Sequence, residues 1–174
     1  MRLTTLWALA RSAASIGGEL LARAPHTTRA RKDRLDALYQ GFRPAFAGVE
    51  DVTPEMLRTA LDTASPPLVV DVRAERERSV STLPGAITAS DFLAEPGQAA
   101  GRLVVAFCTL GVRSGAWCRE RNDEGVVVAN LAGGLLAWTH AGGELVAADG
   151  APTRRVHVSG SHWDLVPKCY EGVW

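Results

Sequence analysis

A cysteine in the middle of the chain has the surroundings of a nucleophile. Cys108 follows directly on the apolar segment Leu103–Phe107 and opens a short loop that ends at Ser114. The segment predicts a buried strand, and Ser114, a residue type that often caps helices, predicts a helix behind the loop. Backbone N–H groups of the loop and the helix N-terminus would then surround the thiol, attract anions and stabilise a thiolate.

The loop after this cysteine favours the same chemistry. Gly111 has no side chain, so backbone N–H groups can turn toward the sulfur at this position. Arg113 can add a full positive charge near the thiol, or it can hold the loop to a carboxylate, and both roles are open. We expect the whole loop to contact a substrate; its residues are Thr109, Leu110, Gly111, Val112, Arg113 and Ser114.

A polar pair stands at the end of another apolar segment. Leu68–Val72 is largely apolar, which is typical of a buried parallel strand. Asp71 and Arg73 stand at its carboxyl end, where ligand sites of α/β proteins form. For these two residues we favour an ion pair that supports the neighbouring loop.

The segments that must position these residues alternate between helix and strand patterns. A helix is predicted to begin at Thr53-Pro54-Glu55, because proline and an acidic residue are both favoured in a first turn. Such alternation is typical of an α/β domain with a parallel sheet. The expected elements are helix 53–63, strand 68–72, a short helix within 73–78, a short strand after the turn at Pro84-Gly85, strand 103–107, helix 114–124, strand 126–129 and helix 133–141.

The N-terminal segment carries an excess of basic residues. Residues 1–45 hold eight Lys and Arg against three Asp and Glu, whereas residues 46–174 hold eleven against sixteen. The apolar spacing predicts an amphipathic helix at the start of the chain and a second helix over 29–40, capped by Thr28 and followed by Gly41. A solvated basic face accounts for the excess; contact of residues 1–45 with a membrane surface or a protein is the alternative.

The tail after residue 147 is rich in turns but also in large apolar side chains, so we expect it to dock on the domain. These apolar residues are Val156, Val158, Trp163, Val166, Tyr170 and Trp174.

Several features argue against other classes of protein. The three cysteines are odd in number and widely spaced, which disfavours a disulfide framework or a metal site and favours a reducing compartment. No apolar run approaches the ~20 residues of a membrane span, and charges interrupt the apolar start too often for a secretory signal. No phosphate-binding glycine loop, dinucleotide fingerprint or nucleic-acid surface is present. We expect a cytoplasmic protein without cofactor or metal; targeting to an organelle is the alternative.

Four motifs in order along the chain resemble the rhodanese family of sulfurtransferases. They are Val70-Asp71-Val72-Arg73 with Glu75, then Leu83-Pro84-Gly85-Ala86-Ile87, then Cys108–Ser114, and last Asn130-Leu131-Ala132-Gly133-Gly134-Leu135-Leu136-Ala137-Trp138. The resemblance implies a three-layer α/β/α fold with a roughly five-stranded parallel sheet. It divides the chain into an N-terminal helical extension (1–45), a rhodanese domain (48–147) and a docked C-terminal tail (148–174).

The resemblance also implies a mechanism. Cys108 would take the outer sulfur of thiosulfate or of a small or protein-bound persulfide, hold it as a persulfide, and pass it to a thiol or cyanide acceptor. Four residues separate Cys108 from Arg113. Phosphatases and arsenate reductases of the same fold resemble Cys-x5-Arg, with a wider loop that fits a tetrahedral oxyanion, so the shorter loop favours sulfur transfer. A non-catalytic rhodanese-like binding module and a phosphatase or arsenate reductase are the alternatives.

The chain departs from the family pattern at two places. The loop interior, Thr109–Val112, is uncharged, whereas relatives specialised for thiosulfate often have a more basic loop. We therefore expect a larger or protein-bound persulfide to be the better donor. Many relatives also carry a histidine just before the Pro-Gly-Ala turn, where this chain has Ser81-Thr82-Leu83. The sequence leaves the oligomeric state open.

Overall fold

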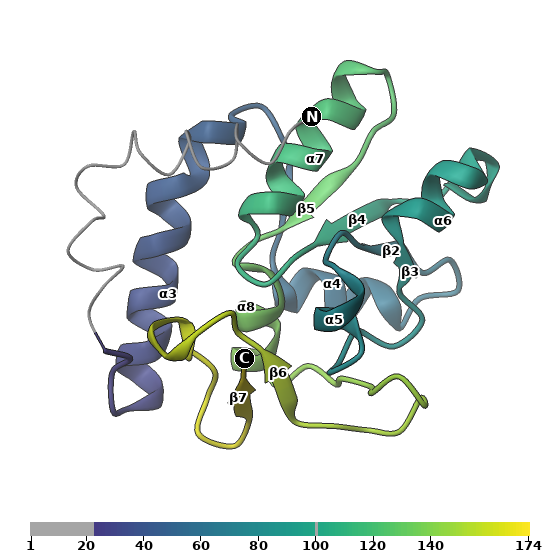
Figure 1. The fold of residues 1–174 in the computed structure, drawn as a ribbon. Helices are drawn as coiled ribbons and strands as arrows, with labels where there is room; N and C mark the ends of the chain where they lie inside the picture. Colours follow the sequence, from purple (N-terminus) through teal and green to yellow (C-terminus); the bar gives the residue numbers. More distant parts are fainter. Residues whose placement is uncertain (1–22, 100) are drawn as a thin grey trace.

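A five-stranded parallel sheet lies at the centre of the structure, a computed structural model that describes residues 23–99 and 101–174 (Figure 1). Its strand order is β1-β5-β4-β2-β3, and every pairing is parallel. The strands are β1 (Asp51–Val52), β2 (Leu68–Asp71), β3 (Ile87–Thr88), β4 (Val104–Phe107) and β5 (Ala129–Leu131). The predicted α/β fold with a parallel sheet is therefore confirmed.

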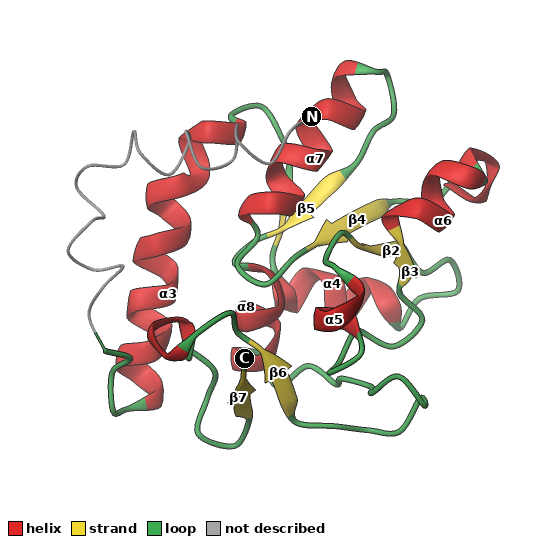
Figure 2. Ribbon diagram, in the orientation of Figure 1, coloured by secondary structure: helices red, strands yellow, loops and turns green. Residues whose placement is uncertain are grey.

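Helices cover both faces of this sheet, as the three-layer prediction requires (Figure 2). The helices are α3 (Thr28–Phe42), α4 (Pro54–Leu61), α5 (Glu75–Arg78), α6 (Ala89–Ala94), α7 (Val112–Asp123) and α8 (Gly134–His140), with short 3-10 helices η1 (Arg43–Phe46), η2 (Pro96–Ala99) and η3 (Ser161–Trp163). Two short strands of the tail, β6 (Arg155–His157) and β7 (Glu171–Val173), pair with each other in parallel. In the described part of the chain, no helix is long and apolar enough to cross a membrane.

The central strand β4 contributes side chains to two hydrophobic cores. Its side chains alternate between the two faces of the sheet, as in any strand. Val105 and Phe107 lie in the core that includes residues of α4 and α8, whereas Val104 and Ala106 lie in the core that includes residues of α6 and α7. Because both faces are covered, the strand is apolar throughout up to Cys108, which explains the sequence pattern that predicted it.

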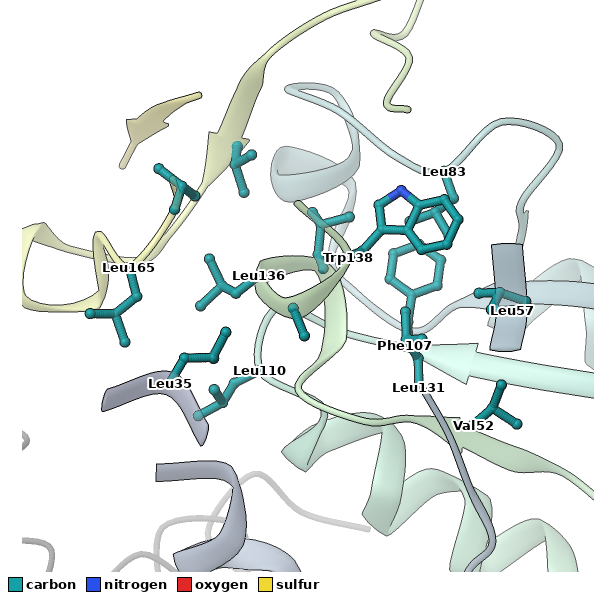
Figure 3. Packing of buried hydrophobic residues seen from close by; sticks show 14 of the residues in the cluster. Leu35, Val52, Leu57, Leu83, Phe107, Leu110, Leu131, Leu136, Trp138 and Leu165 are labelled. Carbon is teal, nitrogen blue, oxygen red and sulfur yellow. The ribbon is translucent and has the colours of Figure 1, made fainter. Parts of the chain in front are cut away.

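The first core also holds the helix before the sheet and the tail after it. Leu35 of α3 and Leu165 of the tail are fully buried in it, and Figure 3 shows both beside Leu110 and Leu136. Other buried tail residues of this core are Val156, Val158 and Val166. Arg31 of α3 also donates a hydrogen bond to the carbonyl of Val166 at 2.8 Å. The helix that precedes the sheet in the sequence and the tail that follows it thus share one core with the sheet.

Several predicted boundaries are wrong. The strand expected over 126–129 lies later, at Ala129–Leu131, because Val126 and Val128 belong to the turn after α7, where Asn122 bonds the Val128 backbone. Helix α7 begins at Val112, two residues before its predicted start.

The helix expected over 29–40 is longer than the sequence predicts. The prediction that Thr28 is its cap is wrong by one residue: the helix begins at Thr28, and the Thr27 hydroxyl accepts a hydrogen bond from the Ala30 N–H. It runs on through Gly41 to Phe42, because burial of Phe42 in the core extends it. The amphipathic helix expected before it lies outside the described residues.

The start of α8 is built around two glycines that bring it against the Cys108 loop. Gly133 and Gly134 have φ values of +68° and +58°, which disfavour any residue with a side chain. A Cβ on Gly134 would lie 2.3 Å from the Cys108 carbonyl oxygen. Without that side chain, the Leu135 N–H reaches the Cys108 carbonyl at 2.8 Å and the Leu136 N–H reaches the Thr109 carbonyl at 3.1 Å.

We expect Gly134→Ala to lower the free energy of unfolding by roughly 2–4 kcal/mol, because a positive φ and a clash with backbone both oppose the methyl group. Gly142→Ala is the matched control: Gly142 has a φ of +73°, but a Cβ there meets nothing within 4 Å. The control should cost roughly 1 kcal/mol in urea unfolding. Equal losses in the two variants would show that the contact between α8 and the loop is not tight.

Candidate active site

The Cys108 sulfur lies in a backbone cradle at the carboxyl end of β4. The residue is 1% exposed, and the Gly111 N–H donates a hydrogen bond to Sγ at 3.2 Å. Gly111 has a φ of +87° and is the N-cap of α7. The prediction that Ser114 caps this helix is therefore wrong: the left-handed glycine starts the helix earlier, and Ser114 lies buried inside its first turn.

Electrostatics of the cradle favour the thiolate form of Cys108. Burial alone raises the pKa of this thiol, because it disfavours a charge. The positive charge of Arg113 and hydrogen bonds from the backbone of Ser114 and Leu110 outweigh burial and lower the pKa below its ordinary value. The site thus has the electropositive surroundings typical of reactive cysteines.

Arg113 is held by a buried carboxylate, Glu77 of α5. Its Nη1 and Nη2 atoms donate to Oε2 and Oε1 of Glu77 at 2.8 and 2.6 Å, a two-pronged ion pair. Glu77 also accepts a hydrogen bond from the Thr109 hydroxyl at 3.2 Å. Burial raises the pKa of Glu77, but hydrogen bonds and charge from Arg113 lower it to about 2. Arg113 therefore braces the loop and lowers the pKa of Cys108, and its contact with a substrate stays a prediction.

Glu77 was not identified from the sequence as a residue of this site. The acidic residue quoted in the family motif was Glu75, which instead pairs with Arg78 at the surface. Glu75 and Glu77 both stand in the charged run 75–78, and the linear pattern does not distinguish them. The turn of α5 decides that Glu77 faces inward, where it is 1% exposed.

Asp71 and Arg73 form a buried ion pair beside this loop. The Arg73 Nε and Nη2 atoms donate to the two carboxylate oxygens of Asp71 at 2.9 and 2.7 Å, and Nη2 also donates to the Ser81 carbonyl at 2.6 Å. The Arg73 guanidinium lies over the ring of Phe107, the last residue of β4. The Thr82 hydroxyl donates to Asp71 at 2.8 Å. The pair thus connects the segment after β2 with the turn that stands where many relatives carry a histidine.

Asn130 is a second polar residue of the site that was not identified from the sequence. Asn130 of β5 is fully buried; its Nδ2 donates to the Gly111 carbonyl at 3.1 Å, and its Oδ1 accepts from the Ser114 hydroxyl at 2.7 Å. A polar residue within a buried apolar strand is the signal that could have identified it. Asn130 thus bonds two of the loop residues that the sequence predicted.

The remaining loop residues and cysteines lie as follows. The Leu110 side chain is buried among core residues, so only its backbone faces the sulfur, and Val112 packs partly buried between the two cores. Cys118 is in the core, where burial raises its pKa to about 12, and Cys169 is exposed. Among the described residues, no group of three or more His, Cys, Asp or Glu side chains could hold a metal ion.

Comparison with known proteins decides the family. A family model described as a rhodanese-like domain matches residues 53–141, just over half of the chain. The chain belongs to the rhodanese-like domain family. A comparison with curated proteins found no match.

Solved structures similar to this rhodanese-like chain include proteins from three different organisms. A thiosulfate sulfurtransferase from Pseudomonas aeruginosa is 22% identical, with a TM-score of 0.53; the match covers 67% of this chain and 23% of that one. A rhodanese-like domain protein from Staphylococcus aureus is 25% identical, with a TM-score of 0.46, covering 52% and 91%. A protein of unknown function from Rhodopseudomonas palustris, described as a possible tyrosine phosphatase, is 23% identical, with a TM-score of 0.48, covering 68% and 92%. The likeness to the Pseudomonas protein supports the rhodanese-like fold.

Replacing Arg113 should make Cys108 less reactive. We expect Arg113→Gln to raise the pKa of the Cys108 thiol and to slow its alkylation by iodoacetamide near neutral pH, roughly tenfold. Arg121→Gln removes the same charge at the far end of α7, where Arg121 pairs with Glu124, and should leave the rate unchanged. Peptide mass spectrometry assigns the alkylated residue. Equal rates in both variants would contradict a role of Arg113 in the cradle.

Glu77 should make the unfolding free energy of the protein depend on pH in the acidic range. Its pKa is about 2 in the folded chain against 4.5 for the unperturbed group, so its contribution is complete above pH 4.5 and is lost as the pH falls toward 2. We expect Glu77→Gln to lower the unfolding free energy by roughly 2 kcal/mol at neutral pH. That difference from wild type should shrink below pH 4.5. Urea unfolding across pH measures it, with the exposed Glu75→Gln as control; a difference independent of pH would contradict the assignment.

Proposed function

We propose that this rhodanese-like protein is a sulfurtransferase that carries a sulfur atom as a persulfide on Cys108. The observation that carries the proposal is the hydrogen bond from the Gly111 N–H to the Cys108 sulfur in a cradle whose charges lower the thiol pKa. A thiolate is the form that attacks sulfur, and preorganised N–H donors stabilise negative charge on whichever sulfur carries it.

The reaction needs no oxidant or cofactor. The Cys108 thiolate attacks the outer sulfur of the donor, a new S–S bond forms, and the donor's own S–S bond breaks. The bonding electron pair leaves with sulfite, if the donor is thiosulfate, or with the donor thiolate, if it is a persulfide. An acceptor thiolate or cyanide then attacks the outer sulfur of the persulfide and releases Cys108 as thiolate.

A persulfide is the donor class that this loop suits better. The charge of Arg113 is shared with Glu77, and the other loop side chains are uncharged. A small dianion such as thiosulfate therefore gains little from the loop side chains, whereas a persulfide needs only the N–H groups around the transferred sulfur.

We place this chemistry in the cytoplasm, because Cys108, Cys118 and Cys169 are all free thiols, which a reducing compartment maintains. Contact of residues 1–45 with a partner or membrane surface stays a prediction.

Intact-protein mass after treatment with a donor tests the proposal. We expect a gain of one sulfur atom with a small-thiol persulfide, a lower yield with thiosulfate, and loss of the added sulfur when cyanide or a thiol is supplied. Cys108→Ser should abolish the gain. Cys169→Ser is the matched control, because Cys169 is the exposed cysteine, and it should leave the gain unchanged.

Two results would overturn the proposal. If neither donor adds sulfur to Cys108 in the folded wild-type protein, the chain is a rhodanese-like binding module. If the protein hydrolyses an aryl phosphate or reduces arsenate in a Cys108-dependent way without taking up sulfur, the loop serves oxyanion chemistry instead.

A further inference from the structure

We propose that Tyr39 of α3 is a positioning residue of the Cys108 loop and acts through Asn130. The inference rests on the proposed function for what the loop does, but its geometry is independent of the sulfur donor. Tyr39 precedes the residues that match the family model, 53–141, so this would extend the site beyond the rhodanese-like domain.

A chain of buried hydrogen bonds connects Tyr39 to the loop. The Tyr39 hydroxyl donates to Oδ1 of Asp51 at 2.6 Å and accepts from Nδ2 of Asn130 at 2.9 Å. The same Nδ2 donates to the carbonyl of Gly111, and Oδ1 of Asn130 accepts from the Ser114 hydroxyl. Tyr39 is 4% exposed, and Asn130 and Ser114 are fully buried, so water does not compete for the bonds among these three residues, whereas Asp51 is partly exposed.

The Asp51 carboxylate, at the end of this series of hydrogen bonds, sets the direction of each of them. Asp51 is held by Arg43, whose Nε donates to Oδ2 at 2.7 Å, and a carboxylate only accepts. Tyr39 must therefore donate to Asp51 and accept from Asn130. Burial and Asp51 both raise the pKa of Tyr39, which keeps its proton in place.

This direction determines how Asn130 holds the loop. Its amide NH2 faces Tyr39 and the Gly111 carbonyl, and its oxygen faces the Ser114 hydroxyl. The Ser114 hydroxyl donates its proton to this amide oxygen. Asn130 and the Gly115 N–H both hold the Gly111 carbonyl, which helps to fix the backbone of the residue whose N–H donates to the Cys108 sulfur.

The Tyr39 ring contributes a steric limit as well. A Cβ on Gly111 would lie 2.9 Å from Cε2 of Tyr39, so the ring occupies the space beside this left-handed residue. Tyr39 thus contacts the loop directly and bonds it through Asn130.

Tyr39→Phe tests the inference without changing any charge near the sulfur. The charged or titratable groups of the site, all retained in the variant, are Arg113 and Cys118 of α7, Glu77 of α5, Asp51 of β1 and Arg43 of η1. In Tyr39→Phe, Asn130 loses one partner and keeps the Gly111 carbonyl and the Ser114 hydroxyl, so its amide is held by fewer hydrogen bonds. We expect the pKa of Cys108 to rise and its alkylation near neutral pH to slow roughly three- to tenfold.

Measurements are made on the full chain carrying Cys169→Ser, so that Cys108 is the responsive thiol. Thiolate absorbance against pH gives the pKa of Cys108, and iodoacetamide gives the rate; neither needs a sulfur donor. Tyr170→Phe is the matched control, because its hydroxyl donates to the Gly143 carbonyl at 2.9 Å, outside the loop. It should leave both values unchanged.

A double-mutant cycle separates positioning from mere stability. Ser114→Ala removes a second hydrogen bond that orients Asn130, on its oxygen, so the effects of Tyr39→Phe and Ser114→Ala on Cys108 should be non-additive. If Tyr39→Phe lowers only the unfolding free energy and leaves the pKa and rate of Cys108 unchanged, or if the effects add, the inference is wrong. Sulfur uptake by the wild-type protein would still stand in that case, so the two proposals fail separately.

Discussion

The hydrogen bond from the Gly111 N–H to the Cys108 sulfur depends on a backbone that only glycine adopts easily. With φ at +87°, Gly111 both turns its N–H inward and starts α7, so that the helix and the loop point at one sulfur. A buried thiolate is costly, because burial by itself raises the thiol pKa. The fold offsets this cost with fixed donors and one cation, Arg113, and most contacts of the site serve to hold them.

Three separate segments hold the loop, and each bonds a different part of it. Glu77 of α5 holds the guanidinium of Arg113. The N-terminus of α8 donates N–H groups to the carbonyls of Cys108 and Thr109, which fixes the start of the loop. Asn130 of β5 holds the Gly111 carbonyl. Because buried polar groups are costly when unpaired, this arrangement leaves the loop few alternative conformations.

The linear pattern predicted much of the fold but less of the site. The apolar runs before Asp71 and Cys108 indicated the central strands, since strands covered on both faces are apolar throughout. Glu77 and Asn130 were missed as functional residues, because their roles come from partners 36 and 19 residues away, Arg113 and Gly111. The start of α7 was misplaced for a related reason: a left-handed glycine caps it, and a serine within the first turn looked like the better cap.

By itself the sequence determined the candidate nucleophile Cys108, its place after an apolar strand, and its four-residue spacing from Arg113. These features are local, so periodicity and residue type reveal them. Only the tertiary structure decided that Arg113 is paired with Glu77, that Leu110 turns into the core, and that Tyr39 of α3 reaches the loop. Such pairings join residues far apart in sequence, and they depend on which helix face packs against the sheet, which no single segment specifies.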